Sequence, residues 1–178
     1  EGANETEFVP YKNGVVCAKM NHMSYIDGTG TVVWEIDTAI VDPILKVDGN
    51  YILIAEKGRN KICLYIDNKL QYDVDDPDTV MSAELSSNGD VVVVTDKSSY
   101  RGGISVYNKS GEQIFSWASG SDAVICADIS AASRSVAVAL LNSDVTAKTT
   151  VQLFNVNETE SYAKIEMPDT VVYELQFV

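Results

Sequence analysis

The chain has 178 residues, with 13 Lys and Arg against 26 Asp and Glu, and a net charge of −13 at pH 7. A hydrophobic content of 46% fits one globular domain with a sizeable core and excludes a disordered chain. The acidic balance argues against nucleic acid as a partner, because binding it requires a basic surface. No apolar run approaches the roughly 20 residues of a membrane-spanning helix, so we expect no membrane insertion by this segment.

The apolar residues are mainly β-branched. There are 23 Val and 13 Ile but only 9 Leu, and β-branched side chains fit pleated sheets better than helices. The apolar runs are short and are separated by Gly, Asn, Asp and Ser, with no 3.6-residue period. The sequence therefore predicts an all-β fold.

Taken in chain order, a polar acidic stretch at 1–7 comes first. We interpret it as a flexible linker that follows a signal or membrane anchor. Four similar units come next, at about 8–38, 39–76, 77–120 and 121–167, and an apolar stretch at 170–178 predicts one extra strand.

Each unit repeats one order of elements: an apolar strand, a turn, a second apolar strand, a polar loop, an alternating strand, a tight turn and an outer strand. The clearest pair is 49–72 beside 89–115. Four antiparallel strands in about 40 residues are typical of a β-propeller blade. A β-sandwich with regular turns is the alternative. The stretch Val91–Val94 lacks alternation, as a strand covered on both faces should.

The units resemble the repeats of bacterial quinoprotein-like β-propellers, which have seven or eight blades. Residues 27–34 are similar to the D-x-x-G-x-x-x-W pattern of those repeats, and 108–114 carry a second match. The resemblance implies a secreted or cell-surface protein. Quinone-dependent dehydrogenases of this group hold a redox cofactor and a calcium ion, but this chain is too short for that site and lacks their adjacent cysteine pair. We therefore expect no cofactor.

About four blades and one strand leave three alternatives for closure. The chain is part of a larger propeller, or it closes as four blades with the last strand completing the first sheet, or two copies dock as a homodimer. The first alternative predicts that an isolated chain exposes a large apolar face, because an end blade lacks a neighbour.

Candidate ligand-binding residues come from two sets of loops that share one face of a propeller. The b–c loops, between the second and third strands of a unit, carry cations, and the d–a crossovers between units carry acids. We expect an acidic inner ring and a mixed outer ring that bind a cation or a cationic ligand, or else solvated loops with weak ion pairs. The candidate residues are Lys57, Arg59, Lys97, Tyr100, Arg101, Asp75 and Asp76.

No motif predicts catalysis or a metal site. The acidic run at 73–78 places Pro77 and Asp78 where a calcium loop needs an oxygen ligand and a glycine. His22 is the single histidine, and no nucleophile motif accompanies it. Cys17, Cys63 and Cys126 lie inside apolar runs, so we expect buried free thiols. We predict no catalytic residue and no metal ligand.

These observations favour a non-catalytic propeller module for binding or scaffolding, in a bacterial extracytoplasmic or cell-surface protein. Its expected partner is a protein, a small molecule or a glycan, besides the homodimer or the remainder of a larger propeller. The alternative is an enzyme that acts on a carbohydrate or another small molecule at the propeller mouth. Carboxylates that converge in an open central cavity would favour the enzyme, and an apolar plug would favour the scaffold.

Overall fold

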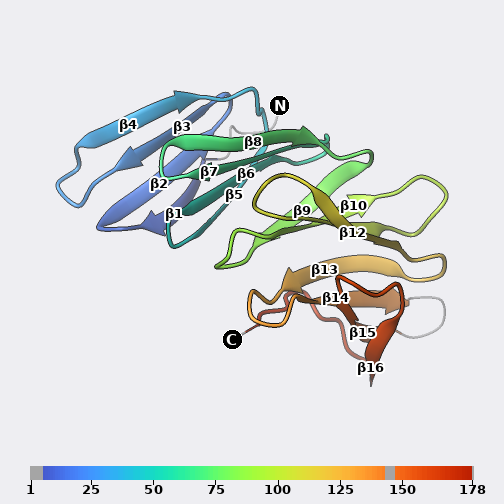
Figure 1. Ribbon diagram of the computed structural model, residues 1–178. Coiled ribbons are helices and arrows are strands. Elements are labelled where there is room, and N and C mark those ends of the chain that lie inside the picture. The colour runs from blue at the N-terminus through green and yellow to red at the C-terminus, as the bar shows by residue number, and fades with distance from the viewer. Residues whose placement is uncertain (1–5, 143–146, 178) are drawn as a thin grey trace.

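The computed structural model describes residues 6–142 and 147–177. In that part of the chain it contains sixteen strands and no helix (Figure 1). They form four antiparallel four-stranded sheets, β1–β4, β5–β8, β9–β12 and β13–β16, each with its strands in chain order. The prediction of an all-β fold built from four-stranded propeller blades is confirmed.

The strands of the first two blades are β1 (Glu7–Tyr11), β2 (Gly14–Lys19), β3 (His22–Ile26), β4 (Val32–Asp37), β5 (Pro43–Asp48), β6 (Tyr51–Glu56), β7 (Lys61–Ile66) and β8 (Lys69–Asp75). Those of blades 3 and 4 are β9 (Thr79–Leu85), β10 (Val91–Asp96), β11 (Gly103–Tyr107), β12 (Gln113–Ala118), β13 (Ala123–Ile129), β14 (Ser135–Asn142), β15 (Lys148–Asn155) and β16 (Ser161–Pro168). Residues 1–5 of the expected linker lie outside the described residues, and Glu7 already belongs to β1.

The blades follow one another along an arc, with β1, β5, β9 and β13 innermost (Figure 1). Each pair of neighbouring blades encloses one apolar cluster, because a single sheet cannot bury both of its faces alone. In a blade with two neighbours the second strand packs on both: in β10, Val91 and Val93 belong to the cluster shared with blade 2, and Val92 and Val94 to the one shared with blade 4. Loss of alternation in this strand is therefore explained by two-sided burial, as expected.

Within the described residues, blade 1 has a neighbouring blade on one side only. Val9 and Tyr11 point into the cluster shared with blade 2, so Phe8, the residue before Val9 in the same strand, points the other way. Its side chain is 63% exposed. The sheet of blade 1 contains β1 to β4 only, so the alternative in which the last strand completes it is wrong.

The C-terminal segment departs from the prediction of an extra strand at 170–178. Residues 170–177 form no strand, and Val178 lies outside the described residues. The segment instead lies against blade 4: the Val172 N–H donates to Thr149 Oγ1 at 3.2 Å, and the Phe177 N–H donates to Asp128 Oδ2 at 2.6 Å. Both N–H groups therefore bond side chains of blade 4 and not the backbone of a neighbouring strand.

Candidate ligand-binding face

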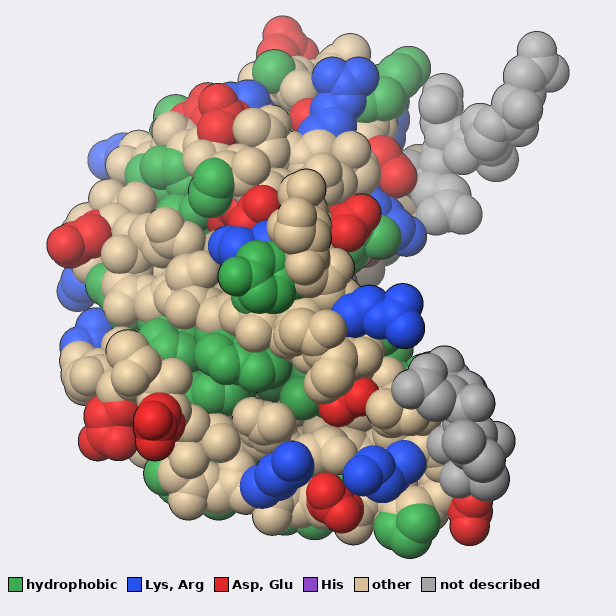
Figure 2. Space-filling view, turned by 90° about the vertical axis from the view of Figure 1, so that its right-hand side faces the viewer, with side chains coloured by type: hydrophobic (Ala, Val, Ile, Leu, Met, Phe, Trp, Pro, Cys, Tyr) green, Lys and Arg blue, Asp and Glu red, His purple; other side chains and the backbone are tan. Residues whose placement is uncertain are grey.

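Backbone hydrogen bonds join the b–c loops to the d–a crossovers. The Gly58 N–H donates to the Val80 carbonyl at 2.8 Å, and the Val80 N–H returns a bond to the Arg59 carbonyl at 2.6 Å. In blade 3 the Arg101 N–H donates to the Ser119 carbonyl at 2.8 Å. The expectation that these loops share one face is confirmed. We name it the loop face, and Figure 2 looks onto it.

A groove of about 570 Å³ lies on the loop face between blades 2 and 3. The b–c loops of both blades and the crossover between them form its walls. The lining residues are Arg59, Asn60, Pro77, Asp78, Thr79, Asp96 and Ser98. Every wall is polar apart from Pro77, so the groove suits a hydrophilic segment of a partner rather than an apolar ligand.

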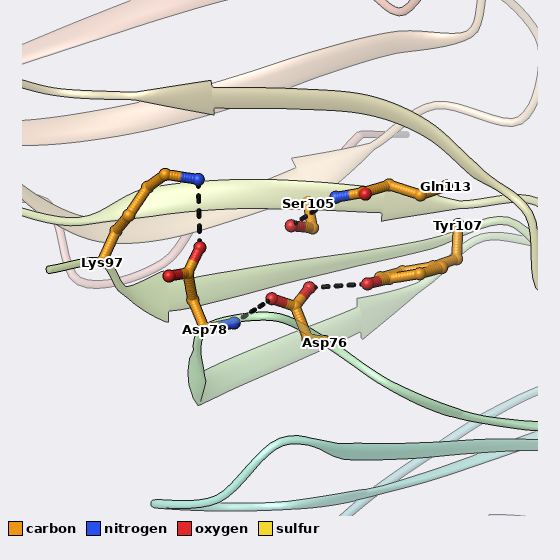
Figure 3. A network of polar contacts seen from close by, with 6 residues as sticks. All are labelled: Asp76, Asp78, Lys97, Ser105, Tyr107 and Gln113. Atoms are coloured by element: carbon orange, nitrogen blue, oxygen red, sulfur yellow. Dashed lines mark hydrogen bonds and ion pairs between the residues drawn. The ribbon is translucent and has the colours of Figure 1, made fainter.

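Beneath the groove, Asp76 anchors the crossover (Figure 3). Its side chain is 1% exposed, and its two carboxylate oxygens accept the Tyr107 hydroxyl and the Asp78 N–H, each at 2.8 Å. Burial, together with the hydrogen bond to Asp76, raises the pKa of Tyr107 above its usual value. The Asp78 carboxylate in turn pairs with Lys97 at 3.0 Å. Asp76 and Lys97 therefore hold the crossover and the blade 3 loop in place.

The other candidate residues divide into paired and unpaired groups. Asp75 lies 3.5 Å from the Lys61 ammonium, and the Arg59 guanidinium lies 3.5 Å from the buried Glu56. By contrast, the side chains of Lys57, Tyr100 and Arg101 are exposed, and none has a polar partner within the described residues. The structure thus brings Arg59 and the loop of Lys97 to one groove, and the unpaired side chains belong to the same two b–c loops.

Side chains of the acidic run and of the histidine lie close to charged side chains of the same blade. Asp73 accepts the Lys61 ammonium at 2.6 Å, and the His22 ring lies 3.7 Å from both Glu35 and Asp37. Among residues 6–142 and 147–177, no group of three or more His, Cys, Asp or Glu side chains is placed to hold a metal ion. The three cysteines carry free thiols, as expected; Cys17 and Cys63 are buried, but Cys126 is only half-buried.

Sequence reasoning missed a second cavity, of about 440 Å³, at the inner edge of the arc. The inner strands and the C-terminal segment line it, and four carboxylates contribute: Asp48, Glu84, Asp128 and Glu174. Lys46 bridges to Glu84 at 2.7 Å. Burial nevertheless raises the pKa of Glu84 above its usual value. A charged residue within each apolar inner strand was the signal that could have revealed this cavity.

Comparisons with solved structures show the same fold. A loop-replaced variant of Hsv2 from Kluyveromyces lactis superposes with a TM-score of 0.67 at 13% identity, over 90% of this chain and 53% of that chain. BamB from Moraxella catarrhalis gives 0.64 at 15% identity, over 89% and 47%. A europium-containing methanol dehydrogenase gives 0.66 at 10% identity, over 90% and 41%.

These likenesses confirm the resemblance to quinoprotein-like and WD40 propellers, and at such identities they concern the fold alone. The chain spans about half the length of the propellers it matches, so its four blades correspond to part of a larger propeller.

No curated protein matches the sequence. No helix long and apolar enough to cross a membrane occurs among the described residues. A family model described as "Family of unknown function (DUF5711)" matches residues 1–178, and the chain belongs to that family.

Proposed function

We propose that this chain is a non-catalytic binding segment of a β-propeller, and that its loop face holds a protein partner. The observation that carries the proposal is the open polar groove between blades 2 and 3, formed by b–c loops that also carry the exposed and unpaired Lys57, Tyr100 and Arg101. Tyr and Arg are enriched among residues that dominate protein interfaces. A wide, shallow groove with a polar wall suits a protein surface better than an enclosed small molecule.

The charge of this face selects the class of partner. The acids of the crossover between blades 2 and 3 are already engaged: Asp75 and Asp78 pair with lysines, and Asp76 is buried. Lys57 and Arg101 on the b–c loops therefore remain available to a ligand, and they outnumber Asp96, the exposed acid of the groove wall that has no side-chain partner in the described part of the chain. Because opposite charges steer association and set specificity, the partner surface proposed for this groove is acidic, in contrast to the cation or cationic ligand expected from the sequence.

We further propose an extracytoplasmic or cell-surface location in a bacterium. The resemblance of residues 27–34 to repeats of bacterial secreted propellers supports it, and so does the fold shared with BamB of Moraxella catarrhalis. Fractionation of the native host, with an antibody against this chain, tests the location. Recovery in the cytoplasmic fraction would contradict it.

Binding is tested with two labelled peptides, poly-glutamate and poly-lysine, followed by fluorescence anisotropy at physiological ionic strength, where the two faces are screened from each other. We expect poly-glutamate to bind and poly-lysine not to bind. A Lys57→Gln/Arg101→Gln variant should bind poly-glutamate about fivefold or more weakly, since each exposed pair contributes up to about 1 kcal/mol. A Lys109→Gln/Arg134→Gln variant removes the same charge from the opposite face and should leave binding unchanged. Equal weakening in both variants would refute the proposal.

A second candidate function is hydrolysis in the inner cavity, because Glu84, Asp128 and Glu174 line it together and the pKa of Glu84 is raised. A raised pKa is what a general acid requires. The test is hydrolysis of a panel of nitrophenyl glycosides by the full chain. This candidate predicts a turnover that Glu84→Gln and Asp128→Asn each abolish. Turnover that survives both substitutions, or no turnover on the panel, rejects it.

A further inference from the structure

The face opposite the loop face carries the a–b turns, between the first and second strands of each blade, and the c–d turns, between the third and fourth. We name it the turn face. Between blades 3 and 4 it holds a hollow of about 270 Å³. Both turns of blade 3 and the a–b turn of blade 4 contribute to its lining: Asn88, Asp90, Asn108, Lys109, Ser110 and Arg134. Two cations from different blades therefore meet at one hollow.

Hydrogen bonds within each turn fix the frame of the hollow. Asn108 Oδ1 accepts the N–H groups of Ser110 and Glu112, at 2.9 and 3.1 Å. The Arg134 N–H donates to the Ser130 carbonyl at 3.0 Å, and the Arg134 carbonyl accepts the Val156 N–H at 3.1 Å. The points from which the Lys109 and Arg134 side chains leave the backbone are thus held in place before any ligand arrives.

The acids near the hollow are engaged, and the cations are not. Asp90 is 4% exposed and accepts the Asn88 amide at 3.1 Å, and Glu112 accepts the Asn108 amide at 3.1 Å. The exposed side chains of Lys109 and Arg134 have no hydrogen-bond or ion-pair partner in the part of the chain that the structure describes. In a chain with twice as many acids as bases, two free cations at one hollow leave a positive site that lacks its anion.

Arg134 also occupies a backbone conformation that disfavours it. Its φ is +51°, in the left-handed region, where a side chain clashes and glycine does not. The a–b turns of blades 2 and 3 have Gly49 and Gly89 at this point, at φ +56° and +86°, whereas the a–b turn of blade 1 has Lys12 at φ +51°. The left-handed conformation therefore belongs to the turn, and what distinguishes Arg134 is that it lines the hollow.

We propose that this hollow binds a tetrahedral oxyanion group, a phosphate or sulfate ester. The Arg134 guanidinium offers a planar fork that bonds two oxygens at once, and Lys109 adds a point charge from the other blade. The Ser110 hydroxyl and the Asn88 amide are hydrogen-bond donors in the same lining. The site is independent of the groove on the loop face.

The test is a titration of the isotopically labelled full chain with inorganic phosphate and, separately, with inorganic sulfate, followed by amide NMR shifts. We expect saturable shifts at Ser110 and Arg134. Shifts with phosphate alone identify a phosphate ester, and shifts with sulfate alone identify a sulfate ester. The absence of saturable shifts with both ions overturns the proposal.

Substitutions separate a site from general charge attraction. Arg134→Gly adopts the residue of the a–b turns of blades 2 and 3, so the fold should be kept, with a melting temperature equal to or above that of the wild type. We expect it to weaken oxyanion binding by about fivefold or more, since hydrogen bonds to charged groups contribute about 1.5 kcal/mol or more. Lys57→Gln/Arg101→Gln, which changes the loop face, should leave the titration unchanged. Equal weakening in that control would overturn the proposal.

Discussion

The buried contact between Tyr107 and Asp76 gives a sharp test of how the crossover between blades 2 and 3 is held. Tyr107→Phe removes one hydroxyl and leaves the ring in its apolar cluster. Asp76 then keeps one donor, the Asp78 N–H at 2.8 Å, for a carboxylate that is 1% exposed. A hydrogen bond to a charged group contributes about 1.5 to 3 kcal/mol. We therefore expect an unfolding equilibrium constant about 10- to 150-fold larger, since about 1.4 kcal/mol corresponds to a factor of ten.

The assay is urea unfolding near pH 7, followed by the fluorescence of Trp117, which packs on Phe154 at 5.0 Å between ring centroids. Tyr162→Phe is the matched control: its hydroxyl meets Ser135 at 3.2 Å, and the residue is 54% exposed. The control should cost less than about 0.5 kcal/mol. A Tyr107→Phe variant as stable as the control would refute the view that Asp76 needs this donor.

Three further predictions concern packing, titration and thiol reactivity. Gly111→Ala should cost clearly more than Gly30→Ala in urea unfolding, because both have φ above +80° but only the first places a Cβ 2.8 Å from the Tyr72 ring; equal costs would contradict this. Burial raises the pKa of Glu84, so ionising this carboxylate destabilises the wild-type fold as the pH rises through that pKa. The melting temperature of Glu84→Gln should therefore rise relative to that of the wild type from about pH 4 to about pH 7. A difference in melting temperature that stayed constant over this range would contradict the prediction. Burial raises the pKa of Cys126 to about 11, so its thiol should react with Ellman's reagent far more slowly in the folded chain than in urea. Equal rates in the two conditions would contradict this prediction.

The fold could be predicted because its signals are local. The turn glycines Gly49 and Gly89, at φ +56° and +86°, mark the same point in two successive blades. The unbroken apolar run Val91–Val94 indicated burial on both faces, and all four residues are buried between the neighbouring blades. The prediction of a strand at 170–178 was wrong because composition is a local signal, whereas a strand also needs a partner strand.

The site was harder to predict because its contacts are distant in sequence. Asp76 resembles its neighbours in an acidic run, and what distinguishes it is a bond to Tyr107, 31 residues away. Lys97 was expected to face a ligand, but it pairs with Asp78 across the crossover. Residue type and loop position predicted correctly that the b–c loops and the d–a crossovers share one face. They could not separate side chains that hold the face together from those that remain free.

The two proposed sites lie at opposite ends of the same strands, and this decides how far they influence each other. A strand such as β10 has six residues, which span about 20 Å at roughly 3.3 Å each. The Debye length is about 8 Å at physiological ionic strength and about 30 Å at 0.01 M. Charge bound at the turn face is therefore screened from the loop face under cellular conditions but not at very low salt. Binding of an acidic partner and of an oxyanion is consequently independent at physiological salt, and a competition between them that persisted there would mean that one site, not two, is responsible.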